Sequence, residues 1–129
     1  MAKFKSPNVT INKTAKELFN KIQDLNNLKD LMPDSIKGFK STETTCSFKM
    51  EDLPRVKLIL KEKIPYSKIS LIAEESQIPF SLDCLIKEKG NKCQAKLEIN
   101  AELNMMMKMM VETPLTEFLE EVASQMKSI

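Results

Sequence analysis

The stretch that decides the fold is residues 92–126, KCQAKLEINAELNMMMKMMVETPLTEFLEEVASQM. Its first part alternates apolar and polar residues without interruption. The apolar positions are Cys93, Ala95, Leu97, Ile99, Ala101 and Leu103, and the polar ones are Gln94, Lys96, Glu98, Asn100 and Glu102. A period of two with one apolar face predicts an antiparallel strand that is buried on one side and solvated on the other.

The second part of this stretch changes to the period of a helix. One apolar stripe contains Leu115, Phe118, Leu119, Val122 and Met126. Asn104 is a good N-cap, so a helix can begin directly after the strand. Pro114 lacks the N–H that would bond to Met110, so we expect a kink or a restart there, with Thr113 as the new cap.

Five of the six residues from Met105 to Met110 are methionine, and the chain has nine. Thioethers bind Cu(I), but residues 1–14 lack the apolar core of a signal peptide that we would expect in a periplasmic carrier, so we disfavour copper. A helix lying on a membrane needs a Lys-rich face, and only Lys108 is present. Two interpretations stay open, because methionine serves both as core filler and as a pliable pocket wall.

Upstream of this stretch, the chain predicts a short strand and two helices. Residues 3–11 form an extended segment that Pro7 interrupts. Thr14 and Glu17 make a capping box that starts a helix, and residues 27–32 form a shorter helix that ends before Pro33.

From residue 36 to 103 the period is two, which predicts a run of antiparallel strands. The inward positions are Cys46, Phe48, Met50, Val56, Leu58, Leu60, Ile69, Leu71, Ala73, Phe80, Leu82, Cys84 and Ile86. A turn at residues 90–91 places Leu97 opposite Cys84, and a loop at residues 76–77 places Phe80 opposite Ala73.

Composition excludes several classes of function. The 129 residues fit one domain, residues 1–129, with a net charge of +2. A single Arg and a single Tyr, without Trp, argue against a nucleic-acid reader. Three cysteines without histidine argue against a disulfide framework or a metal site, and no segment is apolar enough to span a membrane. We expect a cytoplasmic protein with no cofactor.

At this point the chain resembles the START-like superfamily, also called SRPBCC or Bet v 1-like, and within it the small polyketide cyclase/dehydrase and lipid-transport-like proteins. The resemblance rests on VTINKTAKELFNKIQDLNNLKDLMP, STETTCSFKM and AELNMMMKMMVETPLTEFLEEVASQM. It implies an α+β helix-grip fold: a curved antiparallel sheet of about seven strands around a long C-terminal helix, with two short helices after the first strand. Between sheet and helix it implies a pocket for an apolar molecule such as a lipid, sterol or polyketide.

The inward register offers little acid–base chemistry, because ionisable side chains are almost absent from it. Glu88 falls on an inward position of the alternation, but it is next to the turn at residues 90–91. We therefore expect its side chain at the rim of the pocket or in solvent. Cys46, Cys84 and Cys93 are expected to be small buried hydrophobes. Lys108 either reaches water or meets a ligand carboxylate.

We therefore expect non-catalytic binding of an apolar small molecule. The expected ligand-binding residues are Leu31, Met32, Phe48, Leu58, Leu71, Phe80, Leu82, Cys84, Leu97, Ile99, Met107, Met110 and Phe118. Two alternatives remain, a cyclase or hydratase-like enzyme that uses the same pocket and an interaction module with a closed pocket. Ile59 and Ile72, expected as diagonal neighbours on the outer face, suggest a homodimer contact.

Overall fold

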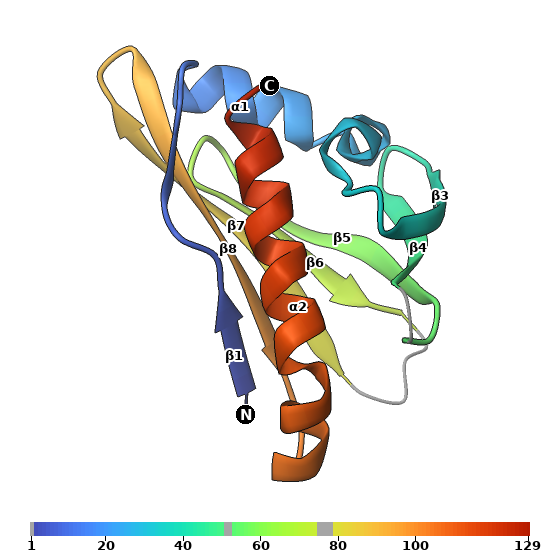
Figure 1. Ribbon diagram of the computed structural model, residues 1–129. Coiled ribbons are helices and arrows are strands. Elements are labelled where there is room, and N and C mark those ends of the chain that lie inside the picture. The colour runs from blue at the N-terminus through green and yellow to red at the C-terminus, as the bar shows by residue number, and fades with distance from the viewer. Residues whose placement is uncertain (1, 51–52, 75–78) are drawn as a thin grey trace.

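In the computed structural model, which describes residues 2–50, 53–74 and 79–129, a curved antiparallel sheet wraps around one long helix, α2 (Met105–Met126) (Figure 1). The strands are β1 (Ala2–Lys5), β2 (Val9–Ile11), β3 (Ile36–Ser41), β4 (Thr45–Met50), β5 (Val56–Ile64), β6 (Lys68–Ala73), β7 (Phe80–Lys89) and β8 (Lys92–Ala101). They follow the order β1-β8-β7-β6-β5-β4-β3, with β2 also paired to β8, so the sheet stays open. The predicted helix-grip fold is confirmed.

The first predicted strand is split in two by the segment around Pro7. β1 and β2 both pair with β8, and Ser6 bridges the gap between them. The Ser6 N–H donates to the Leu97 carbonyl and the Leu97 N–H donates to Ser6 Oγ, both at 2.9 Å. The hydroxyl thus satisfies a strand donor that the proline break would leave unpaired.

Two helices follow, α1 (Ala15–Ile22) and the 3₁₀ helix η1 (Leu25–Leu31). The predicted capping box is present, because the Glu17 N–H donates to Thr14 Oγ1 and the Thr14 N–H donates to Glu17 Oε1. The Glu88 carboxylate accepts from the Ala15 N–H at 3.0 Å, so the end of β7 also holds the start of α1.

The register of the long strands follows the prediction. Cys84 pairs with Leu97 across the turn that joins β7 and β8. Between β6 and β7, Leu71 pairs with Leu82 in the predicted register, and the described pairs end one residue short of Ala73 and Phe80. The loop predicted at residues 76–77 lies outside the described residues.

One predicted neighbour relation on the outer face is wrong. Ile59 and Ile72 are directly opposite each other rather than diagonal. The reason is an irregularity between Leu60 and Glu62, where an extra residue shifts the pairing of β5 and β6. Both isoleucines are half-buried.

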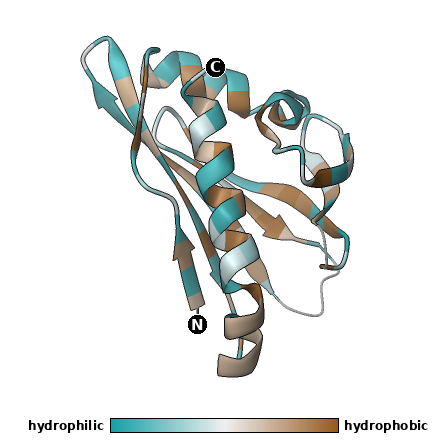
Figure 2. Ribbon diagram, viewed as in Figure 1, coloured by the Kyte–Doolittle hydropathy of each residue, from teal (hydrophilic) through white to brown (hydrophobic). Residues whose placement is uncertain are grey.

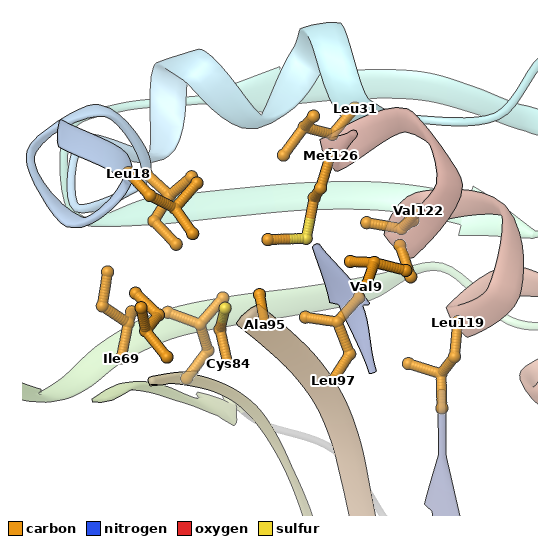
Figure 3. Packing of buried hydrophobic residues seen from close by; sticks show 14 of the residues in the cluster. Val9, Leu18, Leu31, Ile69, Cys84, Ala95, Leu97, Leu119, Val122 and Met126 are labelled. Carbon is orange, nitrogen blue, oxygen red and sulfur yellow. The ribbon is translucent and has the colours of Figure 1, made fainter. Parts of the chain in front are cut away.

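The core fills the space between the concave face of the sheet and α2. Figure 2 shows apolar residues along the strands and along α2, and Figure 3 shows Val122 and Met126 of α2 directed toward Ala95 and Leu97 of the sheet. Leu31 of η1 lies at the same end as Met126. The core therefore joins residues far apart in the chain into one cluster.

Helix α2 begins where predicted and then runs without a restart. Asn104 Oδ1 accepts from the Met107 N–H at 2.8 Å, which confirms the N-cap. Pro114 lies inside the helix, so the expectation that Thr113 caps a second helix is wrong. Met110, whose carbonyl loses its partner to Pro114, is exposed, and water can take the place of the missing donor.

On the outer face of β8, Glu98 is buried beneath two lysines. Its carboxylate lies 3.1 Å from Lys96 Nζ and 3.5 Å from Lys3 Nζ. Burial alone would raise the pKa of the Glu98 carboxyl, but the two ammonium groups outweigh burial and hold the pKa below its usual value.

We predict that Glu98→Gln lowers the free energy of unfolding at neutral pH by about 1–2 kcal/mol. The pKa of Glu98 is lower in the folded state than in the unfolded state. The stabilisation from the ionised carboxylate is therefore fully present above pH 4.5, the usual glutamate pKa, and is lost as the pH falls through the folded-state pKa. Urea unfolding measured from neutral pH down through the acid range checks this. The control is Glu62→Gln, because Glu62 pairs with Lys68 in solvent and its loss should cost less than about 1 kcal/mol. If both variants lose the same free energy of unfolding, or if Glu98→Gln keeps the pH dependence of the wild type, the stabilising role of Glu98 is contradicted.

Candidate ligand-binding site

Two apolar pockets lie between the sheet and α2. The large pocket has a volume of about 160 Å³ and is bounded by β4, β5, β7, β8 and the middle of α2. Its walls are Phe48, Met50, Leu53, Pro54, Arg55, Val56, Leu58, Phe80, Leu82, Ile99, Ala101, Leu103, Val111, Leu115 and Phe118. These side chains are nearly all apolar, so the pocket favours hydrocarbon over water.

The small pocket has a volume of about 50 Å³ and lies toward the C-terminal end of α2, beside α1 and η1. Its walls are Ile22, Leu25, Leu28, Leu31, Met32, Ile69, Leu71, Leu82, Cys84, Leu97, Phe118, Val122 and Met126. Figure 3 shows part of this wall, with Met126 and Val122 on one side and Ile69, Cys84 and Leu97 on the other.

Phe118 and Leu82 belong to the walls of both pockets. Phe118 is buried, and its ring stacks on Phe48 with 5.6 Å between centroids. Phe48 in turn stacks on Phe39 of β3 at 6.3 Å. The two pockets are therefore neighbours, with a row of aromatic rings running to the place where they adjoin.

The structure brings the predicted site residues together with two exceptions. Every predicted residue on the strands and on η1, with Met32 and Phe118, lines one or both pockets. Met107 and Met110 line neither, and Met110 is 72% exposed. That these residues bind a ligand remains a prediction.

The methionine cluster lies on the outside of the helix. Met105, Met106, Met109 and Met110 are 80%, 74%, 72% and 72% exposed, and Met107 is half-buried. These first turns of α2 extend past the end of the sheet, at the bottom of Figure 1. At 3.6 residues per turn, the four exposed methionines share the face opposite Val111 and Leu115, which line the large pocket. Those four therefore neither fill the core nor line either pocket.

Sequence reasoning missed several wall residues. Ile22, Leu25 and Leu28 line the small pocket from α1 and η1, and the helical stripe of residues 15–25 was a signal that could have identified the first two. Leu53 and Pro54 approach the large pocket from the connection between β4 and β5. A connecting segment carries no periodicity, so no pattern indicated that these two face inward.

Arg55 is the one charged residue among the described walls of the two apolar pockets. Its guanidinium is directed to β3 and β4, where Nη2 donates to the Gly38 carbonyl and to Ser47 Oγ. Gly38 has φ +61°, and a Cβ there would come within 2.8 Å of Arg55 Nη1. The glycine thus makes room for an arginine that ties three strands together at the mouth of the large pocket.

The three cysteines lie buried and unpaired. Burial raises the pKa of Cys46 to about 11 and, with smaller contributions from Cys93 and Asp83, that of Cys84 to about 12. Burial also raises the pKa of Cys93. These thiols stay protonated at neutral pH, as expected of small buried hydrophobes, and are poor nucleophiles.

A more polar recess opens on the outer side of Phe118. It has a volume of about 240 Å³ and is lined by Ser35, Ile36, Met50, Pro114, Glu117, Phe118 and Glu121. Met50 also lines the large pocket. The recess thus leads from solvent to the residues that enclose the apolar interior.

Two further findings apply to the described part of the chain alone. It contains no group of three or more acidic, cysteine or histidine side chains placed to hold a metal ion. None of its helices is both long and apolar enough to cross a membrane.

The fold has close counterparts among solved structures. The protein XoxI from Bacillus cereus matches with a TM-score of 0.76 at 12% identity, over 99% of this chain and 94% of that one. Norcoclaurine synthase from Thalictrum flavum, solved with dopamine and hydroxybenzaldehyde, matches with a TM-score of 0.73 at 14% identity, over 98% and 84%. A START superfamily protein from Mycobacterium smegmatis matches with a TM-score of 0.69 at 11% identity, over 98% and 94%.

These likenesses establish the fold. The chain has a START-like, Bet v 1-like (SRPBCC) fold, as its sequence resemblance implied. The sequence matches no protein-family model, and no curated protein matches it at a significant level. Structures at 11–14% identity show a shared fold rather than a shared ligand or reaction.

The exposure of the methionine cluster yields a stability prediction with an internal control. Met109→Ala should change the free energy of unfolding by less than about 0.5 kcal/mol, because Met109 has little contact to lose and alanine favours the helix. Met126→Ala, on the same helix but 1% exposed, should cost about 2–5 kcal/mol. Denaturant unfolding of both variants measures the difference. A large loss for Met109→Ala would mean that the cluster is buried in solution.

Proposed function

We propose that this protein binds an apolar small molecule, without a covalent step, in the space between the sheet and α2. The observation that carries the proposal is the lining of the two pockets. Their walls come from every layer of the fold, and they are apolar except for Arg55, whose guanidinium is engaged on β3 and β4. Interiors are normally packed without such voids, so an apolar space of this kind favours a hydrocarbon occupant.

The pocket volumes bound the ligand. An engineered protein cavity of about 150 Å³ holds benzene, and drug-sized ligands occupy about 300–1,000 Å³. The large pocket, at about 160 Å³, suits one ring or a short chain as it stands. A lipid, sterol or polyketide would require the two pockets to be used together or the walls to move.

A catalytic role finds less support from the same walls. A cyclase or hydratase needs a group that gives or takes a proton at neutral pH. The described walls of the two pockets offer Arg55 and the Cys84 thiol, and the pKa of Cys84 is raised to about 12. The norcoclaurine synthase likeness is a likeness of fold, so we favour binding over catalysis.

The remaining alternative is an interaction module whose interior stays closed. The half-buried pair Ile59 and Ile72 would then contribute to a homodimer contact on the outer face. In either role we place the protein in the cytoplasm, because three unpaired cysteines suit a reducing compartment.

Two matched variants test the binding site. Val111 lines the large pocket, and Met110, the residue before it, is exposed. Val111→Phe should fill the large pocket and weaken binding of a neutral apolar probe, such as 1-hexanol or toluene, by about tenfold, or about 1.4 kcal/mol. Met110→Phe adds an equally large side chain outside and should leave the affinity unchanged. Isothermal titration calorimetry measures both.

The outcome separates the proposals. If wild type binds none of a panel of such probes, and none of them raises its melting temperature, the interior is closed and the interaction module is favoured. If both variants weaken binding equally, the probe sits on the surface instead.

A further inference from the structure

We propose that Phe118 determines which ligands fit, by dividing the apolar interior into two compartments. The occupant of the wild-type protein is then a short, neutral, apolar molecule, a single ring or a short chain, rather than a long lipid. This inference rests on the proposed binding function and goes on to name the ligand class and the residue that sets it.

The position of Phe118 is the first argument. In the described part of the chain, it is the one residue that lines the large pocket, the small pocket and the outer recess alike. Leu82 is shared by the two apolar pockets, and Met50 by the large pocket and the recess. Phe118 thus lies where the two compartments and the recess adjoin.

The packing of the ring is the second argument. Phe118 is 5% exposed and stacks on Phe48, with an angle of 22° between the ring planes. Phe48 is itself buried and stacks on Phe39 at 15°. A ring held in such a row resists displacement, because moving it would break aromatic contacts and would also expose apolar atoms. The partition is therefore part of the folded structure.

The volumes are the third argument. The large pocket has a volume of about 160 Å³ and the small pocket about 50 Å³. Neither pocket alone accommodates a long alkyl chain. A ligand that grows by methylene groups gains affinity only while each new group enters an apolar space, about fourfold for each one. The gain must stop when the chain reaches the Phe118 ring.

A homologous series of neutral 1-alkanols, from 1-butanol to 1-dodecanol, tests this by calorimetry. For the wild type we expect affinity to rise about fourfold per methylene and then to level off at a short chain length. For Phe118→Ala the two compartments join, and the rise should continue to longer chains. The preference between a long and a short alkanol should therefore shift by more than tenfold between the two proteins.

The matched control is Leu119→Ala. Leu119 is the next residue on α2, is fully buried and lines none of these pockets. Its truncation should lower the melting temperature but leave the chain-length limit at the wild-type value. If Phe118→Ala is too unstable to study, Phe118→Leu and Leu82→Ala each thin the same partition and should move the limit in the same direction.

The results separate this inference from the function on which it rests. If wild type and Phe118→Ala level off at the same chain length, Phe118 does not set the limit and the inference is overturned, while binding stands. If neither protein binds any alkanol, both are overturned. If only Phe118→Ala binds, the ring closes the wild-type interior, and both the proposed function and the ligand class inferred for the wild type are overturned.

Discussion

One long helix, α2, has to cover most of the concave face of a curved open sheet, with α1 and η1 closing one end, and the rest of this structure depends on that constraint. Strands β4 to β8 all direct apolar side chains to the concave face of the sheet, and one apolar stripe of α2 packs against them. The helix packs most fully toward its C-terminal end, where Leu119, Ala123 and Met126 are almost completely buried. Toward its N-terminal half, Val111 and Leu115 are only half-buried, and there the larger void remains.

A few side-chain hydrogen bonds connect the elements that frame this interior. Ser6 preserves the pairing of β8 across the proline break, and Glu88 holds the start of α1. Arg55 fixes the beginning of β5 to β3 and β4 at the mouth of the large pocket. Each contact satisfies a backbone group next to the start or the interruption of a strand or helix, where the regular pairing is incomplete.

Much of this could be predicted from the sequence, because period and turn chemistry are local. The alternation in β8 and the turn at residues 90–91 determined the pairing of Cys84 with Leu97. The inward register then identified the pocket walls on the strands. The methionines could not be placed in the same way. A helix with apolar residues on opposite faces does not reveal which face meets the sheet, nor that its first turns extend beyond the sheet edge. The effect of Pro114 was mispredicted for a related reason, since Met110, whose carbonyl loses its partner, is exposed rather than buried.

The central claim is that the fold leaves an apolar space between the sheet and α2, divided at Phe118. Xenon enters dry apolar cavities and scatters X-rays strongly, so a crystal of the wild-type protein under xenon pressure tests this claim most directly. We predict xenon sites in both compartments, one beside Leu82 and Val111 and the other beside Leu82 and Met126, with the Phe118 ring between them. An interior without xenon, closed by side chains across both sites, would contradict the account.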